Sequence, residues 1–204
     1  MIGIVAYGAG NVQAIVRIYN NLKIPNKLII ETADFLGVQK IILPGVGSFD
    51  AVLSKLNESG LRQELTRLVL EEKMPVLGIC VGLQIMAKSS DEGKLTGLGW
   101  INANVKKFDL DKECYVPHMG WNTATISGIN QLFEGVDQDF GFYFVHSFHF
   151  ELNEKIDSVA KTSYGIDFVS AIKKQNIMAT QFHPEKSHSN GVQLLRNFAT
   201  QETC

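Results

Sequence analysis

Short apolar runs that alternate with helical patterns dominate the first half of this 204-residue chain. The runs are Ile2–Tyr7, Lys27–Ile30, Lys40–Leu43 and Val76–Ile79, and the first is apolar on both faces, as a buried parallel strand would be. Between the runs, apolar residues recur at helical spacing. Strand, crossover and strand in this order indicate a parallel sheet with helices on its faces. The sequence therefore predicts an α/β fold.

The second half has a different pattern, with strands joined by short turns. Tyr164-Gly165 and Lys174-Gln175-Asn176 are turns typical of hairpins, and Gly191–Ala199 has helical spacing. We expect a single domain over residues 1–204, with a mixed, mostly parallel central sheet, helices on both faces and antiparallel strands in the second half. The strands expected there are Ile101–Phe108, Trp121–Thr125, Phe142–Phe150, Val159–Ser163, Phe168–Lys173 and Ile177–Phe182.

Charge and cysteine content narrow the class of protein. The formal net charge is −2, so nothing points to nucleic acid or an anionic membrane as a partner. No apolar stretch approaches the ~20 residues of a membrane span, and the N-terminus reads as a first strand and not a signal peptide. Cys80, Cys114 and Cys204 are too few and too scattered for a disulfide framework. We therefore expect a cytoplasmic protein.

The strand Val76–Ile79 runs into Gly78-x-Cys80-x-Gly82, which is a nucleophile elbow with sulfur in place of oxygen. A helix is expected to follow it through Leu83, Ile85, Met86 and Ala87. Glycine is needed there because the sharp strand-to-helix turn brings neighbouring backbone very close. A thiol at a helix N-terminus is favoured as thiolate, and the N–H of Val81 can serve as an oxyanion donor. The alternative is a buried structural cysteine, which is how cysteines commonly occur.

A thiolate nucleophile needs a base that later acts as an acid, and His183 is the candidate. It ends an apolar strand and belongs to His183-Pro184-Glu185. Pro184 favours an extended backbone before it, and residues two apart in an extended segment point the same way. Glu185 can therefore orient His183, as in a triad. The alternative is a strand-end histidine next to a solvent-exposed glutamate.

Four segments resemble class I glutamine amidotransferase domains, which hydrolyse glutamine with a triad: PGVGSF (44–49), GICVGLQ (78–84), HSF (146–148) and QFHPEKS (181–187). More narrowly, five segments look like the glutaminase subunits of imidazole glycerol phosphate synthases: YGAGN (7–11), PGVGSFDA (44–51), PHMGWN (117–122), FYFVHS (142–147) and FHPEKS (182–187). The match covers nearly the whole chain. It implies the flavodoxin-like fold of that family.

The resemblance implies a role for each matching position. Cys80 would attack the side-chain amide of glutamine, His183 would protonate the leaving ammonia and then activate water, and Glu185 would orient His183. The Pro-Gly-Val-Gly strand would supply an oxyanion donor after a peptide rearrangement at Gly45 and Val46, beside the donor of Val81. The positions that fall in the family's glutamine pocket are Gly47, Gln84, His146 and Ser147.

The resemblance also implies a partner. Family subunits form a heterodimer with a (β/α)8-barrel cyclase subunit, to which ammonia is channelled for the formation of imidazole glycerol phosphate and AICAR in histidine biosynthesis. Asn11, Met119, Gly120, Trp121 and Lys186 match segments at or near that interface. An exposed Trp beside Gly suits an interface, whereas without the resemblance Trp121 reads as a core aromatic.

No cofactor and no metal are expected. Gly8-Ala9-Gly10 follows a strand as a dinucleotide fingerprint does, but Gln13 stands where the third glycine would be needed. The histidines have no metal-ligand spacing, and Cys114 with His118 would make a poor zinc site.

Three other functions stay open. Paralogous glutaminases supply ammonia for the amidation of surface-polysaccharide sugars, and residues 88–108 and 144–150 resemble them as well. Two positions depart from the synthase subunits, since Ala6 and Phe148 stand where those commonly have Asp and Tyr. A free-standing cysteine hydrolase and a non-catalytic binding module are the remaining alternatives.

Overall fold

The computed structural model describes residues 1–109, 115–127, 131–156 and 158–201. The helices are α1 (Val12–Asn21), α2 (Phe49–Glu58), α3 (Arg62–Leu70), α4 (Val81–Gln84) and α5 (His188–Thr200), with short 3-10 helices η1 (Thr32–Phe35), η2 (Gln131–Phe133) and η3 (Pro184–Lys186). The strands are β1 (Ile2–Val5), β2 (Asn26–Ile29), β3 (Lys40–Gly45), β4 (Val76–Cys80), β5 (Ser89–Ser90), β6 (Ala103–Lys107), β7 (His118–Asn122), β8 (Thr125–Ser127), β9 (Phe142–His146), β10 (Phe148–Leu152), β11 (Ser158–Tyr164), β12 (Ile166–Lys174) and β13 (Ile177–Thr180).

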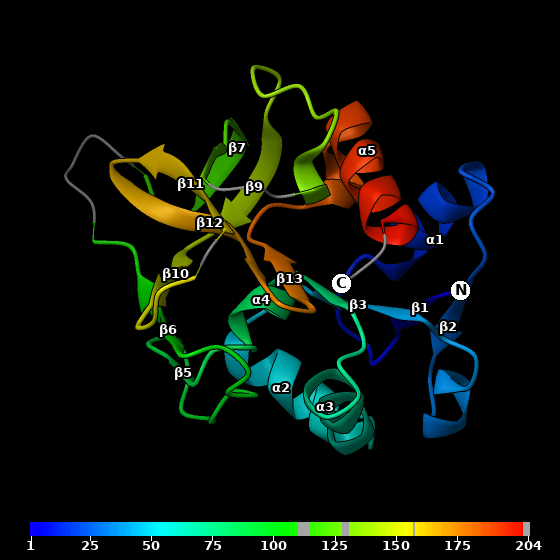
Figure 1. Ribbon diagram of the computed structural model, residues 1–204. Helices are drawn as coiled ribbons and strands as arrows, with labels where there is room; N and C mark the ends of the chain where they lie inside the picture. The colour runs from blue at the N-terminus through cyan, green and yellow to red at the C-terminus, as the bar shows by residue number, and fades with distance from the viewer. Residues whose placement is uncertain (110–114, 128–130, 157, 202–204) are drawn as a thin grey trace.

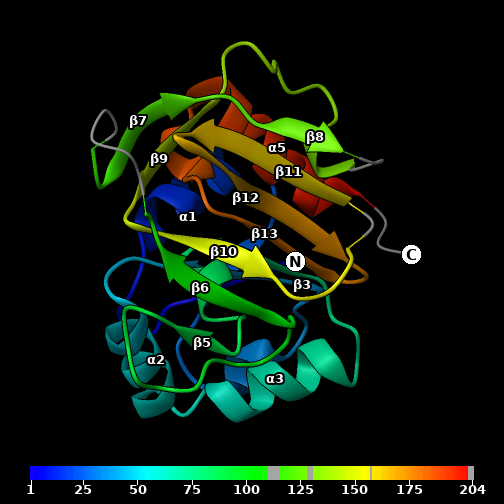
Figure 2. The same ribbon diagram turned by 90° about the vertical axis from the view of Figure 1, so that its left-hand side faces the viewer.

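One large mixed sheet forms the centre of the molecule, in the order β2-β1-β3-β4-β13-β12-β10-β6-β5. The first five strands are parallel, whereas β12, β10 and β6 are each antiparallel to the strand before them. Helices α1 and α5 lie on one face of the parallel part, and α2 and α3 lie on the other (Figure 1). A separate sheet pairs β7 with β9 (Figure 2). The predicted α/β fold with a mixed sheet is confirmed.

The parallel strands form the core because they are apolar on both faces. Every residue of β1, β4 and β13 is buried, as is all of β3 after Lys40. Burying one Val, Leu or Ile side chain contributes about 1.5–3 kcal/mol, so these strands anchor the fold. Helices α1 and α5 are tied together by the Tyr19 hydroxyl, which donates to the Leu195 carbonyl at 3.1 Å. No helix among the described residues has the length and apolar character to cross a membrane.

The two predicted hairpins are present, since β11–β12 turns at Gly165 and β12–β13 turns at Gln175. The expected single strand Phe142–Phe150 is instead two strands that separate at Ser147. His146 pairs with His118 in the small sheet, whereas Phe148 pairs with Lys107 in the large one, so the chain passes from one sheet to the other.

Two other expectations need correction. The expected strand Trp121–Thr125 is divided between β7 and β8, and the two join different sheets. The helix after Cys80 ends at Gln84 and not at Ala87. It stops because the carbonyls of residues 85–87 accept hydrogen bonds from residues 98–101: Leu98 donates to Ile85, Gly99 to Ala87 and Ile101 to Met86.

Strand β3 and the β4–α4 turn approach so closely that only glycine fits between them. A Cβ at Gly82 would lie 2.0 Å from the carbonyl oxygen of Leu43, and one at Gly45 would lie 2.4 Å from the nitrogen of Gly82. A Cβ at Gly78 would lie 2.9 Å from the carbonyl oxygen of Gly82. These contacts are with backbone, which cannot move aside cheaply. The elbow is therefore fixed by backbone packing.

We expect Gly82→Ala to lower the free energy of unfolding by about 1–3 kcal/mol, as overpacking does. Helix propensity alone would favour alanine in α4, so the loss would report the collision with Leu43. Urea denaturation measures it. Gln63→Ala, at an exposed position of α3, is the control, and its free energy of unfolding should change by no more than about 0.5 kcal/mol. Equal stability of the two variants would contradict the packing argument.

Candidate active site

The end of β4 places Cys80 in a strained position at the start of α4. Its φ of 54° and ψ of −110° lie where L-residues rarely occur, and its side chain is buried. Such a conformation costs on the order of 1–3 kcal/mol and persists only where the surroundings enforce it. Here β4 is held between β3 and β13, and the glycine contacts leave no other path for the chain.

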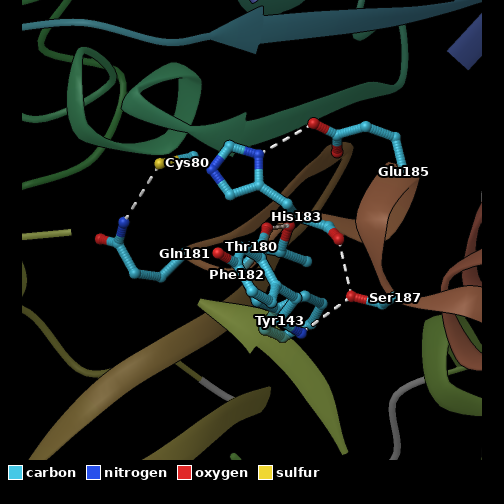
Figure 3. Close-up of polar contacts among 8 residues, drawn as sticks. All are labelled: Cys80, Tyr143, Thr180, Gln181, Phe182, His183, Glu185 and Ser187. Carbon is cyan, nitrogen blue, oxygen red and sulfur yellow. Dashed lines mark hydrogen bonds and ion pairs between the residues drawn. The ribbon is translucent and has the colours of Figure 1, made fainter. Parts of the chain in front are cut away.

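His183 and Glu185 lie beside Cys80, directly after β13. The Nδ1 of His183 is 2.9 Å from Oε1 of Glu185, and both side chains are 2% exposed. Figure 3 shows the imidazole lying between the Cys80 sulfur and the Glu185 carboxylate. Because the carboxylate accepts the Nδ1 proton, Nε2 is the nitrogen left for the sulfur. The structure thus brings the three predicted catalytic residues together.

The backbone around His183 is held at three points. Its N–H donates to the Tyr143 carbonyl at 2.9 Å, and its own carbonyl accepts from the Ser187 hydroxyl at 2.6 Å. The same hydroxyl accepts from the N–H of Tyr143 at 3.0 Å, which closes a ring of contacts between β9 and η3 (Figure 3). The backbone that carries the His183 imidazole is therefore fixed before any ligand binds.

The charge balance at His183 favours a protonated ring. Burial alone lowers the pKa of His183, but the charge and hydrogen bond of Cys80 oppose it, and so do those of Glu185. Together they raise the pKa of His183 to about 10. The His183 imidazole therefore carries a proton at neutral pH and lies between a sulfur and a carboxylate, where it can act as a proton donor to the pocket.

Gln181 lies near the Cys80 sulfur, and no role was predicted for it from the sequence. Its Nε2 donates to Cys80 Sγ at 3.7 Å, and its Oε1 accepts from Gln84 Nε2 at 3.1 Å. Gln84 Nε2 also donates to the Phe148 carbonyl at 3.1 Å. The signal was present in the sequence, since Gln181 precedes His183 by two positions in an extended segment and so faces the same side.

A pocket of about 320 Å³ opens above Cys80 and His183. It has the size of a site for a small ligand. Every residue expected in the substrate site or as an oxyanion donor is in its wall: Val46, Gly47, Val81, Gln84, His146 and Ser147.

The residues expected at a partner interface are on the surface. Met119 is 60% exposed and Trp121 is 44% exposed, so Trp121 is not a core aromatic. The Trp121 ring stacks on His188 with 5.3 Å between centroids and meets Phe140 edge-on. Gly120 lies between Met119 and Trp121 in β7. Asn11 and Lys186 line a second, shallow hollow, which they share with the pocket residue Val46.

Two further expectations concern metals and cysteines. Within the described ranges, no group of three or more His, Cys, Asp or Glu side chains is placed to hold a metal ion. Cys114 and Cys204, for which neither a disulfide framework nor a zinc site is expected, lie outside the described residues.

Comparisons with known proteins identify the family of the chain. Residues 5–201 match the family model for class-I glutamine amidotransferases. The chain is 46% identical to imidazole glycerol phosphate synthase subunit HisH of Leptospira borgpetersenii, over 98% of this chain and 100% of that protein. It is 49% identical to the HisH subunit of Bdellovibrio bacteriovorus, over 98% and 99%.

Solved structures share the fold at lower identity. PurLQS from Thermotoga maritima has a TM-score of 0.73 at 13% identity, covering 97% of this chain and 96% of that one. A glutamine amidotransferase has a TM-score of 0.68 at 21% identity, covering 97% and 96%.

The raised pKa of His183 can be tested by NMR titration of the imidazole. A raised pKa means that the ring keeps its proton at pH 7 to 8 and releases it only as the pH rises toward about 10. Cys80→Ala should lower this pKa, because burial then acts with less opposition. Gln63→Ala should leave it unchanged. Titration of wild-type His183 near its ordinary value would contradict the ion-pair assignment.

Proposed function

Because the chain belongs to the class I glutamine amidotransferase family, and within it to the HisH subunits of imidazole glycerol phosphate synthase, we propose that Cys80, His183 and Glu185 hydrolyse L-glutamine to glutamate and ammonia. The observation that carries the assignment of these residues is their geometry, with an elbow cysteine, a buried imidazole and a carboxylate 2.9 Å from it at one pocket.

The proposed reaction has two stages. The Cys80 thiolate attacks the amide carbonyl carbon, and the resulting oxyanion accepts a hydrogen bond from the N–H of Val81. His183 gives its proton to the leaving nitrogen, so ammonia departs and a thioester remains. His183 then takes a proton from water, whose hydroxide attacks the thioester carbonyl. The tetrahedral intermediate expels Cys80 as thiolate, and the proton that His183 took from water remains on the imidazole, which restores the imidazolium–thiolate pair. Glutamate leaves, and its carboxyl proton passes to solvent.

The pocket wall suits the rest of the substrate. Gln84, His146, Ser147 and Gly47 line it and are proposed to hold the α-amino and carboxylate groups of glutamine, His146 through its main chain. Both N–H groups of Gln84 are already donated, to Gln181 and to the Phe148 carbonyl. Its oxygen is therefore the atom it can offer to a ligand, and an oxygen selects a donor such as an ammonium group.

A second oxyanion donor would come from the end of β3. A peptide rearrangement at Gly45 and Val46 would turn the N–H of Val46 toward the reacting carbonyl. The segment is anchored just before this point, because the Tyr7 hydroxyl donates to the Pro44 carbonyl at 2.5 Å. Val46 itself is exposed, and Gly47 has a φ of 126°, which glycine permits.

Val46 also explains how a partner could regulate the reaction. It lines both the active-site pocket and the hollow that contains Asn11 and Lys186. We propose that the chain forms a heterodimer with a (β/α)8-barrel cyclase subunit, which covers this hollow and the Met119–Trp121 segment of β7. Contact with the cyclase would then bear directly on the oxyanion loop, and ammonia would pass to the cyclase for formation of imidazole glycerol phosphate and AICAR.

The function is tested by measuring ammonia release from glutamine. We expect weak activity from the chain alone and strong activation by the cyclase subunit with its nucleotide ligand, because the oxyanion site is completed on assembly. Cys80→Ala should reduce the rate by roughly 10³-fold or more while leaving the fold intact, and Gln63→Ala should not change it. Full activity of Cys80→Ala would disprove the mechanism. Activity that the cyclase does not alter would disprove the proposed partner.

The proposed interface predicts a specific loss on truncation of its exposed aromatic. We expect Trp121→Ala to weaken binding of the cyclase subunit by about 2 kcal/mol, or roughly 30-fold, as an anchor residue does. Leu36→Ala is a matched control, because Leu36 is 86% exposed and follows η1 rather than lying on β7. Isothermal titration calorimetry measures both. Equal affinities would place the interface elsewhere.

A further inference from the structure

Two buried histidines lie in contact behind the wall of the pocket. His118 on β7 and His146 on β9 are directly paired in the small sheet, and both side chains are buried. His118 Nδ1 is 3.0 Å from His146 Nε2. His146 belongs to the pocket wall, whereas His118 belongs to the strand that presents Met119 and Trp121 on its other face. The pair therefore joins the pocket to the exposed strand.

The neighbours of the pair determine which nitrogen carries each proton. The Phe148 carbonyl can only accept, so the contact of 2.8 Å from His146 Nδ1 requires a proton on that nitrogen. His146 Nε2 is then an acceptor, and His118 Nδ1 must donate to it. His118 Nε2 in turn faces the Asn122 amide nitrogen at 3.3 Å, which donates. The hydrogen bonds therefore all run the same way, from Asn122 through His118 and His146 to the Phe148 carbonyl. Both rings are neutral and protonated on Nδ1.

The surroundings hold both rings in this state. Burial lowers the pKa of His118 to about 4 and that of His146 to about 3, so neither ring is charged at pH 7. His118 is also fixed in position by stacking on Tyr164 and Phe144, with ring centroids 4.0 Å and 4.7 Å apart. Its donor is therefore aimed at His146 by packing as well as by hydrogen bonding.

The same network continues to the nucleophile. The Phe148 carbonyl that accepts from His146 also accepts from Gln84, which donates to Gln181, which donates to Cys80 Sγ. Both ring nitrogens of His146 are used inside the protein, so its imidazole has none left for a ligand. The imidazole is a structural part of the turn at His146–Phe148, where the chain leaves the small sheet.

We propose that His118 is a positioning residue for the glutamine site, which donates to His146 Nε2, holds the His146 ring in one orientation and thereby fixes the pocket-lining turn at residues 146–148. This inference rests on the proposed function, since it assumes that glutamine binds in this pocket. Glutamine would then contact the turn through Ser147 and the main chain, not through the His146 ring nitrogens. The hydrogen bond from His118 to His146 would then affect the affinity for glutamine, although His118 does not contact glutamine itself.

The tautomers are testable in the wild-type chain. Two-bond ¹H–¹⁵N correlation spectra distinguish an imidazole protonated on Nδ1 from one protonated on Nε2. We expect His118 and His146 both to be neutral and protonated on Nδ1 at pH 7. An Nε2-protonated His146, or a charged ring at either position, would overturn the inference without any substitution.

Kinetics of two variants test the consequence, with the cyclase subunit present. His118→Phe keeps a ring to stack on Tyr164 and Phe144 but removes the donor, and His118→Asn places an amide near the Nδ1 position. Leaving a buried acceptor unpaired costs about 1–3 kcal/mol, so His118→Phe should raise the KM for glutamine roughly 5- to 100-fold, with kcat changed far less. His118→Asn should recover part of that loss. In His118→Phe, the spectra should show a shifted ¹⁵N signal of His146 Nε2, because this nitrogen loses its hydrogen-bond donor.

The outcomes separate this inference from the proposed function. An active wild-type chain whose KM and His146 spectrum are unchanged in folded His118→Phe would overturn the role of His118 alone. A fall in kcat with an unchanged KM would also overturn it. A wild-type chain that releases no ammonia from glutamine in the presence of the cyclase would overturn the proposed function, and with it the glutamine-site role. If His118→Phe does not fold, the wild-type spectra and His118→Asn still decide the question.

Discussion

The contact between the β4–α4 turn and the neighbouring strand β3 is the constraint on which the site depends. Glycine at position 82 lets the turn rest against the Leu43 carbonyl, and Gly45 lets β3 approach in return. This packing leaves Cys80 no relaxed backbone conformation, so the residue has a positive φ and lies at the carboxyl end of β4. Strain that would be unfavourable in isolation is offset by a core of fully buried strands. The reactive group is therefore positioned by backbone, which few substitutions can alter.

The rest of the site follows from strand order. Because β13 lies next to β4 and is parallel to it, both strands end at the same edge of the sheet. His183 follows β13 within a few residues, and Gln181 lies between them on the same side. The end of β9 and the residue after it, His146 and Ser147, add to the wall of the pocket. The reactive side chains therefore follow parallel strands, and residues from the antiparallel half add to the pocket wall. Sites in α/β folds generally lie at the carboxyl ends of the strands in this way.

Local patterns made much of this predictable, and long-range contacts account for the remainder. The buried strands, the elbow at Cys80 and the His183–Glu185 pair depend on spacing and on neighbours in sequence, so they could be expected. The break at Ser147 could not, because it depends on which sheet each half of the segment joins. The early end of the helix after Cys80 depends on hydrogen bonds from residues 98–101. The partnership of His118 with His146 likewise arises only when β7 and β9 pair.

The central position of β13 has a consequence for the synthesis of the chain. The sulfur of Cys80 and its partners directly after β13 are separated by about a hundred residues, and β13 lies between β4 and β12 in the middle of the sheet. A ribosome that has made β1 to β4 has already produced the cysteine and its strand, but not the imidazole. The thiol gains its acid and its orienting carboxylate only when nearly the whole chain has emerged and the last strand has been inserted. Nascent chains, and chains truncated before β13, thus lack the complete set of Cys80, His183 and Glu185. The site is assembled late in folding.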